Sequence, residues 1–131
     1  QGVYSDVRGF GFGAATTGTQ FLRGYRLTDA QGSAQFLTIY PGWYGGRAVH
    51  VHFKIRSSGA GGEMRDFTSQ LYFDERLTEH VYAREPYAQR RQRWLRNADD
   101  ALYRDGGRAL TLAPAPDGDG YAASFDVALP A

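Results

Sequence analysis

The 131 residues of this chain are enough for one domain with a substantial core and too few for two ordinary domains. Its 15 Lys and Arg residues nearly balance its 14 Asp and Glu residues, so the formal net charge is +1 and no overall field favours nucleic acid or an anionic membrane. The chain has no cysteine, which excludes disulfides, zinc–thiolate sites, iron–sulfur clusters and thiol nucleophiles.

The N-terminal third of the chain is predicted to form a loop followed by a hairpin. Residues 8–18 (RGFGFGAATTG) are too rich in glycine for regular structure and are predicted to be a loop. Residues 20–27 and 34–40 are rich in strand-favouring side chains, and the turn-forming residues 28–32 between them predict a hairpin. A Pro-Gly pair at residues 41–42 ends the second strand, and an aromatic loop follows.

The middle of the chain carries the clearest strand pattern. Apolar and polar residues alternate strictly over residues 47–56, so one strand face is apolar and the other carries His50 and His52. A second alternating run over residues 66–73, which includes Gln70, is predicted to pair with the first in a long-looped hairpin.

The C-terminal half is predicted to add short helices and a closing hairpin. Asp74 can cap a short helix over residues 75–82, and a further helical turn is predicted over residues 87–94. Residues 108–113 and 121–129 are predicted to form a hairpin around a turn that contains proline and glycine. The 17 Gly, 9 Tyr and 8 Phe of the chain also favour an all-β fold, and no apolar run approaches the roughly 20 residues that cross a bilayer.

The two histidines of the central strand are candidate metal ligands. Side chains two residues apart on a strand project from the same face, about 7 Å apart along its axis, and can converge on one cation. Further ligands cannot be cysteines, and the nearest carboxylates along the chain, Asp29 and Glu63, lie well outside the strand. Tyrosines remain, and because a phenol has a pKa of about 10 it binds only a strongly Lewis-acidic cation. Tyrosine ligation therefore points to Fe(III).

The residues around the histidine pair resemble one enzyme family. Residues 40–44 (YPGWY) and 47–52 (RAVHVH) are similar to the Y/K-P-G-x-Y…R-x-x-H-x-H block of intradiol ring-cleavage dioxygenases. Residues 2–5 (GVYS) resemble the G-x-Y segment of the family, and residues 68–73 (TSQLYF) match its T-x-Q-L-Y-F strand. The resemblance extends over nearly the whole chain and is greatest to the single-domain, secreted bacterial branch.

The resemblance implies a metal site and a reaction. The implied cofactor is one mononuclear non-haem Fe(III), held by Tyr4, Tyr44, His50 and His52. The implied catalytic residues are Tyr44, which leaves the metal when substrate arrives, together with Arg47 and Gln70. The implied reaction cleaves catechol-type aromatic diols between their hydroxylated carbons with O2 and gives cis,cis-muconate-type products.

The resemblance also sets expectations for the whole domain. We expect residues 1–131 to form one catalytic domain, an all-β antiparallel β-sandwich with short helices and long loops. In the family, strands precede the first tyrosine ligand, whereas Tyr4 stands near the start here, so the N-terminal part of the domain is expected to be missing. The expected partners are a small catechol-type substrate and O2, without nucleic acid or membrane. The family suggests a homodimer, and its secreted branch suggests an extracellular location.

Two other interpretations of the same residues stay open. In a non-catalytic β-sandwich module of carbohydrate-binding or transthyretin-like type, the aromatic side chains form a binding face and the histidines are incidental. In a Zn(II) hydrolase, His50 and His52 bind zinc together with a carboxylate. Both alternatives predict a colourless protein, whereas ferric tyrosinate absorbs visible light. The choice among catechol, protocatechuate and larger lignin-derived diols is also left open.

Overall fold

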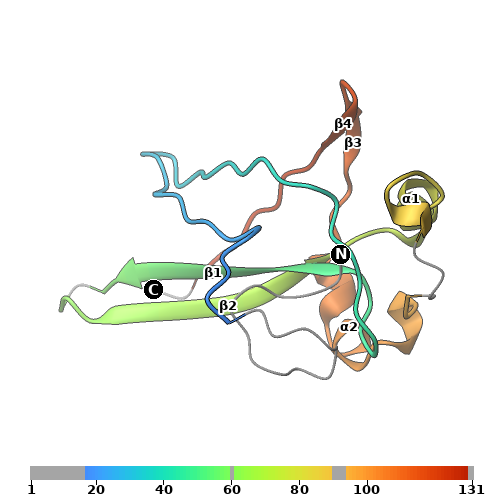
Figure 1. Ribbon diagram of the computed structural model, residues 1–131. Coiled ribbons are helices and arrows are strands. Elements are labelled where there is room, and N and C mark those ends of the chain that lie inside the picture. The colour runs from blue at the N-terminus through green and yellow to red at the C-terminus, as the bar shows by residue number, and fades with distance from the viewer. Residues whose placement is uncertain (1–16, 60, 90–93, 130–131) are drawn as a thin grey trace.

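A long two-stranded hairpin dominates the computed structural model, which describes residues 17–59, 61–89 and 94–129. Its strands are β1 (His50–Ser58) and β2 (Met64–Tyr72), and a second small sheet pairs β3 (Ala115–Asp117) with β4 (Gly120–Ala122). The helical elements are α1 (Glu75–Tyr82), η1 (Tyr87–Gln89), η2 (Asn97–Asp99), α2 (Ala101–Arg104) and η3 (Gly107–Leu110). Figure 1 shows the helices gathered at the end of the hairpin where β1 begins and β2 ends.

The pairing of β1 with β2 is antiparallel along both strands. His50 lies opposite Tyr72, and His52 lies opposite Gln70. Directly opposed residues in an antiparallel pair point to the same face, so these four side chains share one face at the helical end of the hairpin. The predicted hairpin is confirmed, with strand ends that differ by one to three residues from the expected ones.

The helix after β2 forms where the sequence predicts it. The Asp74 carboxylate accepts hydrogen bonds from the backbone N–H groups of Arg76 at 2.9 Å and Leu77 at 3.2 Å, and α1 follows directly. The helical turn expected over residues 87–94 is present as η1 at its start, and residues 90–93 lie outside the described residues.

An aromatic core joins α1 to the loop before β1. Trp43, Val49, Phe73 and Tyr82 are buried together. The Tyr82 ring centroid lies 4.5 Å from that of Trp43 and 5.0 Å from that of Trp94, and its hydroxyl donates to the carbonyl of Pro41 at 2.8 Å. These contacts fix the loop that leads into β1.

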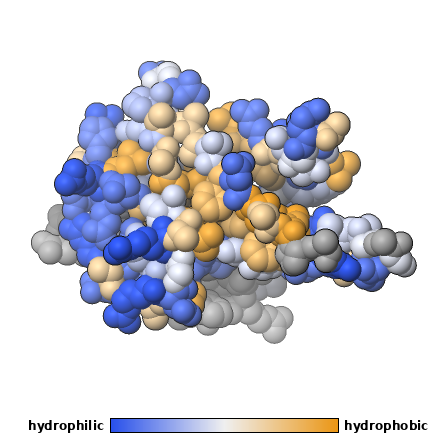
Figure 2. Space-filling model, turned by 180° about the vertical axis from the view of Figure 1, so that it is seen from behind, coloured by the Kyte–Doolittle hydropathy of each residue, from blue (hydrophilic) through white to orange (hydrophobic). Residues whose placement is uncertain are grey.

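The hairpin expected over residues 20–27 and 34–40 does not form. The turn between them does, because the backbone N–H of Asp29 donates to the Ser33 carbonyl at 2.9 Å. Several large flanking side chains stay exposed: Leu37 is fully exposed, and Figure 2 shows apolar surface across the middle of one face of the molecule. Strand-favouring composition does not hold two strands together without a buried face.

The closing hairpin forms at a different place from the one expected. β3 and β4 lie in and next to the expected turn, whereas residues 107–110 form η3. Thr111 instead forms a parallel bridge with Tyr72, and the Leu112 N–H donates to the Tyr72 carbonyl at 2.9 Å. Residues 111–112 thus pair with the end of β2 and not with residues 121–129. The described residues confirm antiparallel strands, short helices and long loops, and the β-sandwich stays a prediction. None of the described helices has the length and apolar character needed to span a bilayer.

The aromatic core predicts how the Tyr82 ring contributes to stability. Tyr82→Ala is expected to lower the free energy of unfolding by about 3–5 kcal/mol, since it leaves a cavity between Trp43 and Trp94. Tyr82→Phe should cost about 1 kcal/mol, because it removes only the hydrogen bond to Pro41. Urea denaturation measures both, with exposed Leu37→Ala as the control; equal losses for the two Tyr82 variants would contradict this account.

Candidate metal centre

Three donor atoms from the start of β1 and the loop before it meet at one point. The Nε2 atoms of His50 and His52 lie 3.0 Å apart, and their rings stack with centroids 4.9 Å apart. The hydroxyl of Tyr44 lies 3.3 Å from His50 Nε2. Tyr44 lies in the loop before β1, two residues before Gly46. Gly46 is exposed and has a φ of 82°. Tyr4, the fourth predicted ligand, lies outside the described residues.

The backbone fixes which nitrogen of His50 faces the other donors. His50 Nδ1 lies 2.6 Å from the carbonyl oxygen of Ala48, which can only accept a hydrogen bond. The neutral ring is therefore assigned its proton on Nδ1, which leaves the lone pair on Nε2. Burial lowers the pKa of His50 to about 4, so the imidazole is neutral at neutral pH.

His52 reaches solvent beside this buried ring. Burial of its inner part and the nearby charge of Arg47 lower the pKa of His52, so both imidazoles are neutral near pH 7. Two nitrogen lone pairs at this distance repel each other. His52 Nε2 can therefore carry a proton and donate it to His50 Nε2, or both lone pairs can bind one cation.

The donor set fits a metal ion bound by two imidazoles and a phenolate. Two nitrogens that each lie about 2.0–2.1 Å from one metal ion, at a right angle, are about 3 Å apart, as the Nε2 atoms of His50 and His52 are. No three His, Cys, Asp or Glu side chains gather in the described parts of the chain. The third donor beside the histidines is the phenol of Tyr44 and not a carboxylate of the described residues.

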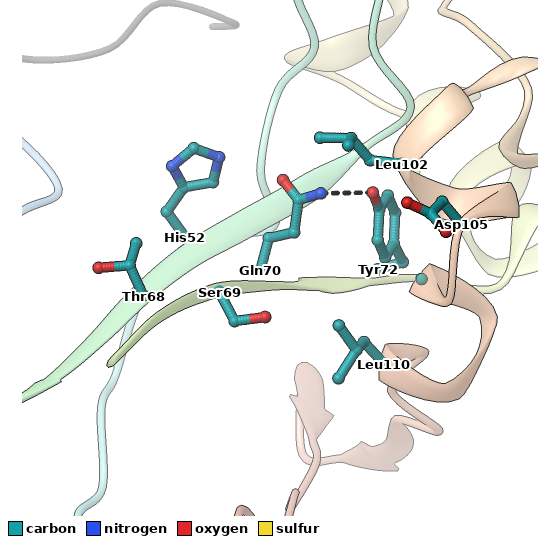
Figure 3. A pocket seen from close by; sticks show the side chains of 9 residues that line it. His52, Thr68, Ser69, Gln70, Tyr72, Leu102, Asp105 and Leu110 are labelled. Carbon is teal, nitrogen blue, oxygen red and sulfur yellow. Dashed lines mark hydrogen bonds between the residues drawn. The ribbon is translucent and has the colours of Figure 1, made fainter. Parts of the chain in front are cut away.

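Arg47 and Gln70 meet next to the histidines. Arg47 Nη2 donates to Gln70 Oε1 at 3.0 Å and to the hydroxyl of Tyr72 at 3.3 Å. Gln70 Nε2 donates to the same Tyr72 hydroxyl, as the dashed line in Figure 3 shows. The sequence singled out Arg47 and Gln70 but not Tyr72, although Tyr72 follows Gln70 on the same strand face and is fully buried.

Asp100 is a further residue of the centre that the sequence did not single out. Its carboxylate accepts hydrogen bonds from Arg47 Nε at 2.9 Å and from the backbone N–H of Ala48 at 2.8 Å. Burial alone would raise the pKa of Asp100, but these two bonds and the Arg47 charge outweigh it and lower the pKa. The one available signal was its place as an N-cap residue before Ala101–Arg104, which indicates a helix start and no more.

A cavity of about 330 Å³ opens beside the centre. Figure 3 shows His52, Gln70 and Tyr72 on the two strands, with α2 and η3 next to them. Its lining residues are His52, Thr68, Ser69, Gln70, Tyr72, Leu102, Asp105, Gly107 and Leu110. The cavity therefore connects one candidate ligand and the Gln70 amide with apolar walls and one carboxylate.

Two solved structures resemble this chain in fold and sequence. An intradiol ring-cleavage dioxygenase from Tetranychus urticae matches with a TM-score of 0.55 and 26% identity, over 65% of this chain and 41% of that one. The dioxygenase Tetur07g02040 matches with a TM-score of 0.60 and 29% identity, over 68% of this chain and 42% of that one. The chain resembles intradiol ring-cleavage dioxygenases.

This match confirms the family resemblance that the sequence motifs indicate. The chain spans less than half the length of either solved dioxygenase chain, at 41% and 42%. No family model and no curated protein sequence matches it. The structural matches favour the dioxygenase interpretation over the binding module and the zinc hydrolase.

The low pKa of His50 predicts how stability of the metal-free protein depends on pH. An unfolded histidine has a pKa of about 6.5, whereas that of folded His50 is about 4, so between these values the unfolded chain binds a proton that the folded chain does not. Stability should be complete above pH 6.5 and fall as the pH drops toward 4, with a loss of about 2 kcal/mol at pH 5. Urea denaturation at pH 7 and pH 5 measures this difference.

Two variants test the assignment to His50. His50→Gln should make the dependence on pH clearly weaker without abolishing it, because His52, whose pKa is also lowered, remains. His80→Gln should leave it unchanged, since His80 is exposed on α1. The same slope in wild type and His50→Gln would show that another group is responsible.

Proposed function

We propose that the chain carries the catalytic centre of an intradiol ring-cleavage dioxygenase that binds one mononuclear Fe(III). The observation that carries the proposal is the gathering of three donors around His50 Nε2, which lies 3.3 Å from the Tyr44 hydroxyl and 3.0 Å from His52 Nε2. Tyr4 is the proposed fourth ligand. Residues 1–131 then belong to one catalytic β-sandwich domain, and its partners are a catechol-type diol and O2.

The donor chemistry supports ferric iron over other metals. Imidazole binds several transition metals, but a phenol loses its proton only to a strong Lewis acid such as Fe(III). When bound, the ferric ion supplies Lewis acidity that draws electron density from a chelated diol and makes its ring reactive toward O2. The neutral state of His50 near pH 7 suits it to this role, because only a neutral imidazole has a lone pair to donate.

Tyr44 supplies a base at the point where a diol must lose its protons. A catechol that would chelate through both oxygens must lose two protons: the Tyr44 oxygen, as a phenolate, would accept one, and the other would pass to solvent, which His52 reaches. Gly46, two residues after Tyr44, gives the loop a backbone position with a positive φ that glycine adopts without strain. Deprotonation of the diol would then accompany departure of the Tyr44 oxygen from its place beside His50 Nε2.

Arg47 and Gln70 supply fixed polar groups beside the reacting ring. The Arg47 guanidinium is held by Gln70 Oε1 at 3.0 Å, so its charge does not have to reorganise as the reaction proceeds. Negative charge that develops on the substrate after O2 adds is stabilised there. The charge does most where little water competes, and the side chain of Arg47 is only 21% exposed.

The cavity beside His52 supports a small aromatic substrate. Its volume of about 330 Å³ lies at the lower end of the range for small-molecule sites. Leu102 and Leu110 give it apolar walls, while the Gln70 amide and the Asp105 carboxylate give it polar groups. A compact diol fits a cavity of this size better than a sugar chain does.

Colour and product formation test the proposed function. Protein loaded with Fe(III) is expected to absorb visible light through tyrosinate-to-iron charge transfer, and Tyr44→Phe should weaken and shift the band. Incubation with catechol and O2 should give muconate absorbance in the ultraviolet, and His50→Ala should lower that rate at least about 100-fold. His80→Ala is the matched control, because this third histidine of the chain is exposed on α1. A protein that stays colourless with Fe(III) at pH 7 and leaves catechol intact would refute the proposal.

A further inference from the structure

We propose that Asp100 is the positioning residue of the centre: its buried carboxylate sets the direction in which the Arg47 guanidinium points. The inference rests on the proposed function, because the aim of Arg47 matters for catalysis only if the centre is that of a dioxygenase. Asp100 stands 53 residues after Arg47 and comes from a different element, the N-cap of α2.

The Asp100 carboxylate is saturated by four donors. One oxygen accepts from Arg47 Nε at 2.9 Å and from the Ala48 N–H at 2.8 Å. The other accepts from the N–H groups of Leu102 at 2.9 Å and Tyr103 at 3.2 Å. With a side-chain exposure of 1%, Asp100 has exchanged its water for these bonds.

Only an ionised carboxylate satisfies this arrangement. Its two oxygens offer about four acceptor sites, whereas an asparagine has one acceptor oxygen and an NH2 group. An amide at position 100 would turn its NH2 either toward Arg47 Nε and the Ala48 N–H or toward the start of α2, and two donors would then face each other. The carboxylate can hold both sides at once, and the amide cannot.

The bond to Nε determines the rest of the Arg47 geometry. A guanidinium is planar and rigid, so once Nε is held by Asp100 the direction of Nη2 is restricted to a narrow range. In that range Nη2 meets Gln70 Oε1 at 3.0 Å and the Tyr72 hydroxyl at 3.3 Å. Without Asp100 the long side chain regains rotamer freedom, and its charge spreads over several positions.

Asp100 also places a negative charge 2.9 Å from Arg47 Nε. Gln70, which accepts from Arg47 Nη2 at 3.0 Å, lies opposite His52 in the hairpin, so the positive charge of Arg47 lies near the imidazoles and by itself disfavours a cation between them. The neighbouring carboxylate offsets that field. The same carboxylate caps α2, which carries the cavity residue Leu102, so one residue holds both Arg47 and the cavity wall.

A double-mutant cycle on the iron-loaded protein tests the role. Asp100→Asn is expected to lower kcat/KM for catechol cleavage by about 10- to 100-fold, mainly through kcat, while the visible band is retained. Arg47→Ala should cause a loss of similar size. In the Arg47→Ala background, Asp100→Asn should change kcat/KM by less than about twofold, because the group on which it acts is already absent.

Two variants separate positioning from simple loss of folding. Asp74→Asn removes the same kind of helix cap at α1, where the carboxylate accepts from Arg76 and Leu77 N–H groups but touches no guanidinium in the contacts described. It should lower stability and leave kcat/KM unchanged. Arg47→Lys keeps the charge and leaves Asp100 intact but removes Nε and the planar fork, so it should lose kcat nearly as much as Arg47→Ala.

The outcomes distinguish this role from the proposed function. A wild-type protein that is colourless and inactive with Fe(III) refutes the proposed function, and the role of Asp100 with it. A coloured and active wild type in which the losses from Asp100→Asn and Arg47→Ala multiply, or in which Arg47→Lys retains full kcat, refutes the role of Asp100 alone.

Discussion

The centre depends on the register between β1 and β2. Because His50 lies opposite Tyr72 and His52 opposite Gln70, the two imidazoles and their polar neighbours emerge from the same face at the same end of the hairpin. A shift of the register by one residue would turn the side chains of one strand to the opposite face of the hairpin. The hydrogen bonds of nine paired residues on each strand hold this register, so the centre is as rigid as the ladder beneath it.

The ion pair between Arg47 and Asp100 is the second contact on which the centre depends. Arg47 lies just before β1, whereas Asp100 stands 53 residues later in the sequence, as the N-cap residue of α2. Their contact at 2.9 Å ties the helical end to the hairpin and points Arg47 at Gln70. A buried ion pair of this kind stabilises only when its remaining bonding capacity is satisfied, as it is for Asp100.

Much of the local structure could be predicted from the sequence, because its causes are local. Strict alternation predicts the hairpin, and the Asp74 carboxylate marks the start of α1. Residues 20–40 favour strands by composition, but whether they pair depends on a packing surface that no local pattern encodes. Family motifs indicated the histidines, Arg47 and Gln70. The sequence did not indicate Asp100, because its contact with Arg47 joins residues 53 positions apart.

The three donors differ in how firmly the backbone holds them. His50 and His52 belong to a hydrogen-bonded strand, and displacing either ring far means breaking backbone pairs. Tyr44 instead stands in a loop, between the buried Trp43 and the exposed pair Gly45-Gly46. In the proposed centre, departure and return of the Tyr44 hydroxyl would therefore require no strand pairing to break, whereas displacement of either imidazole would.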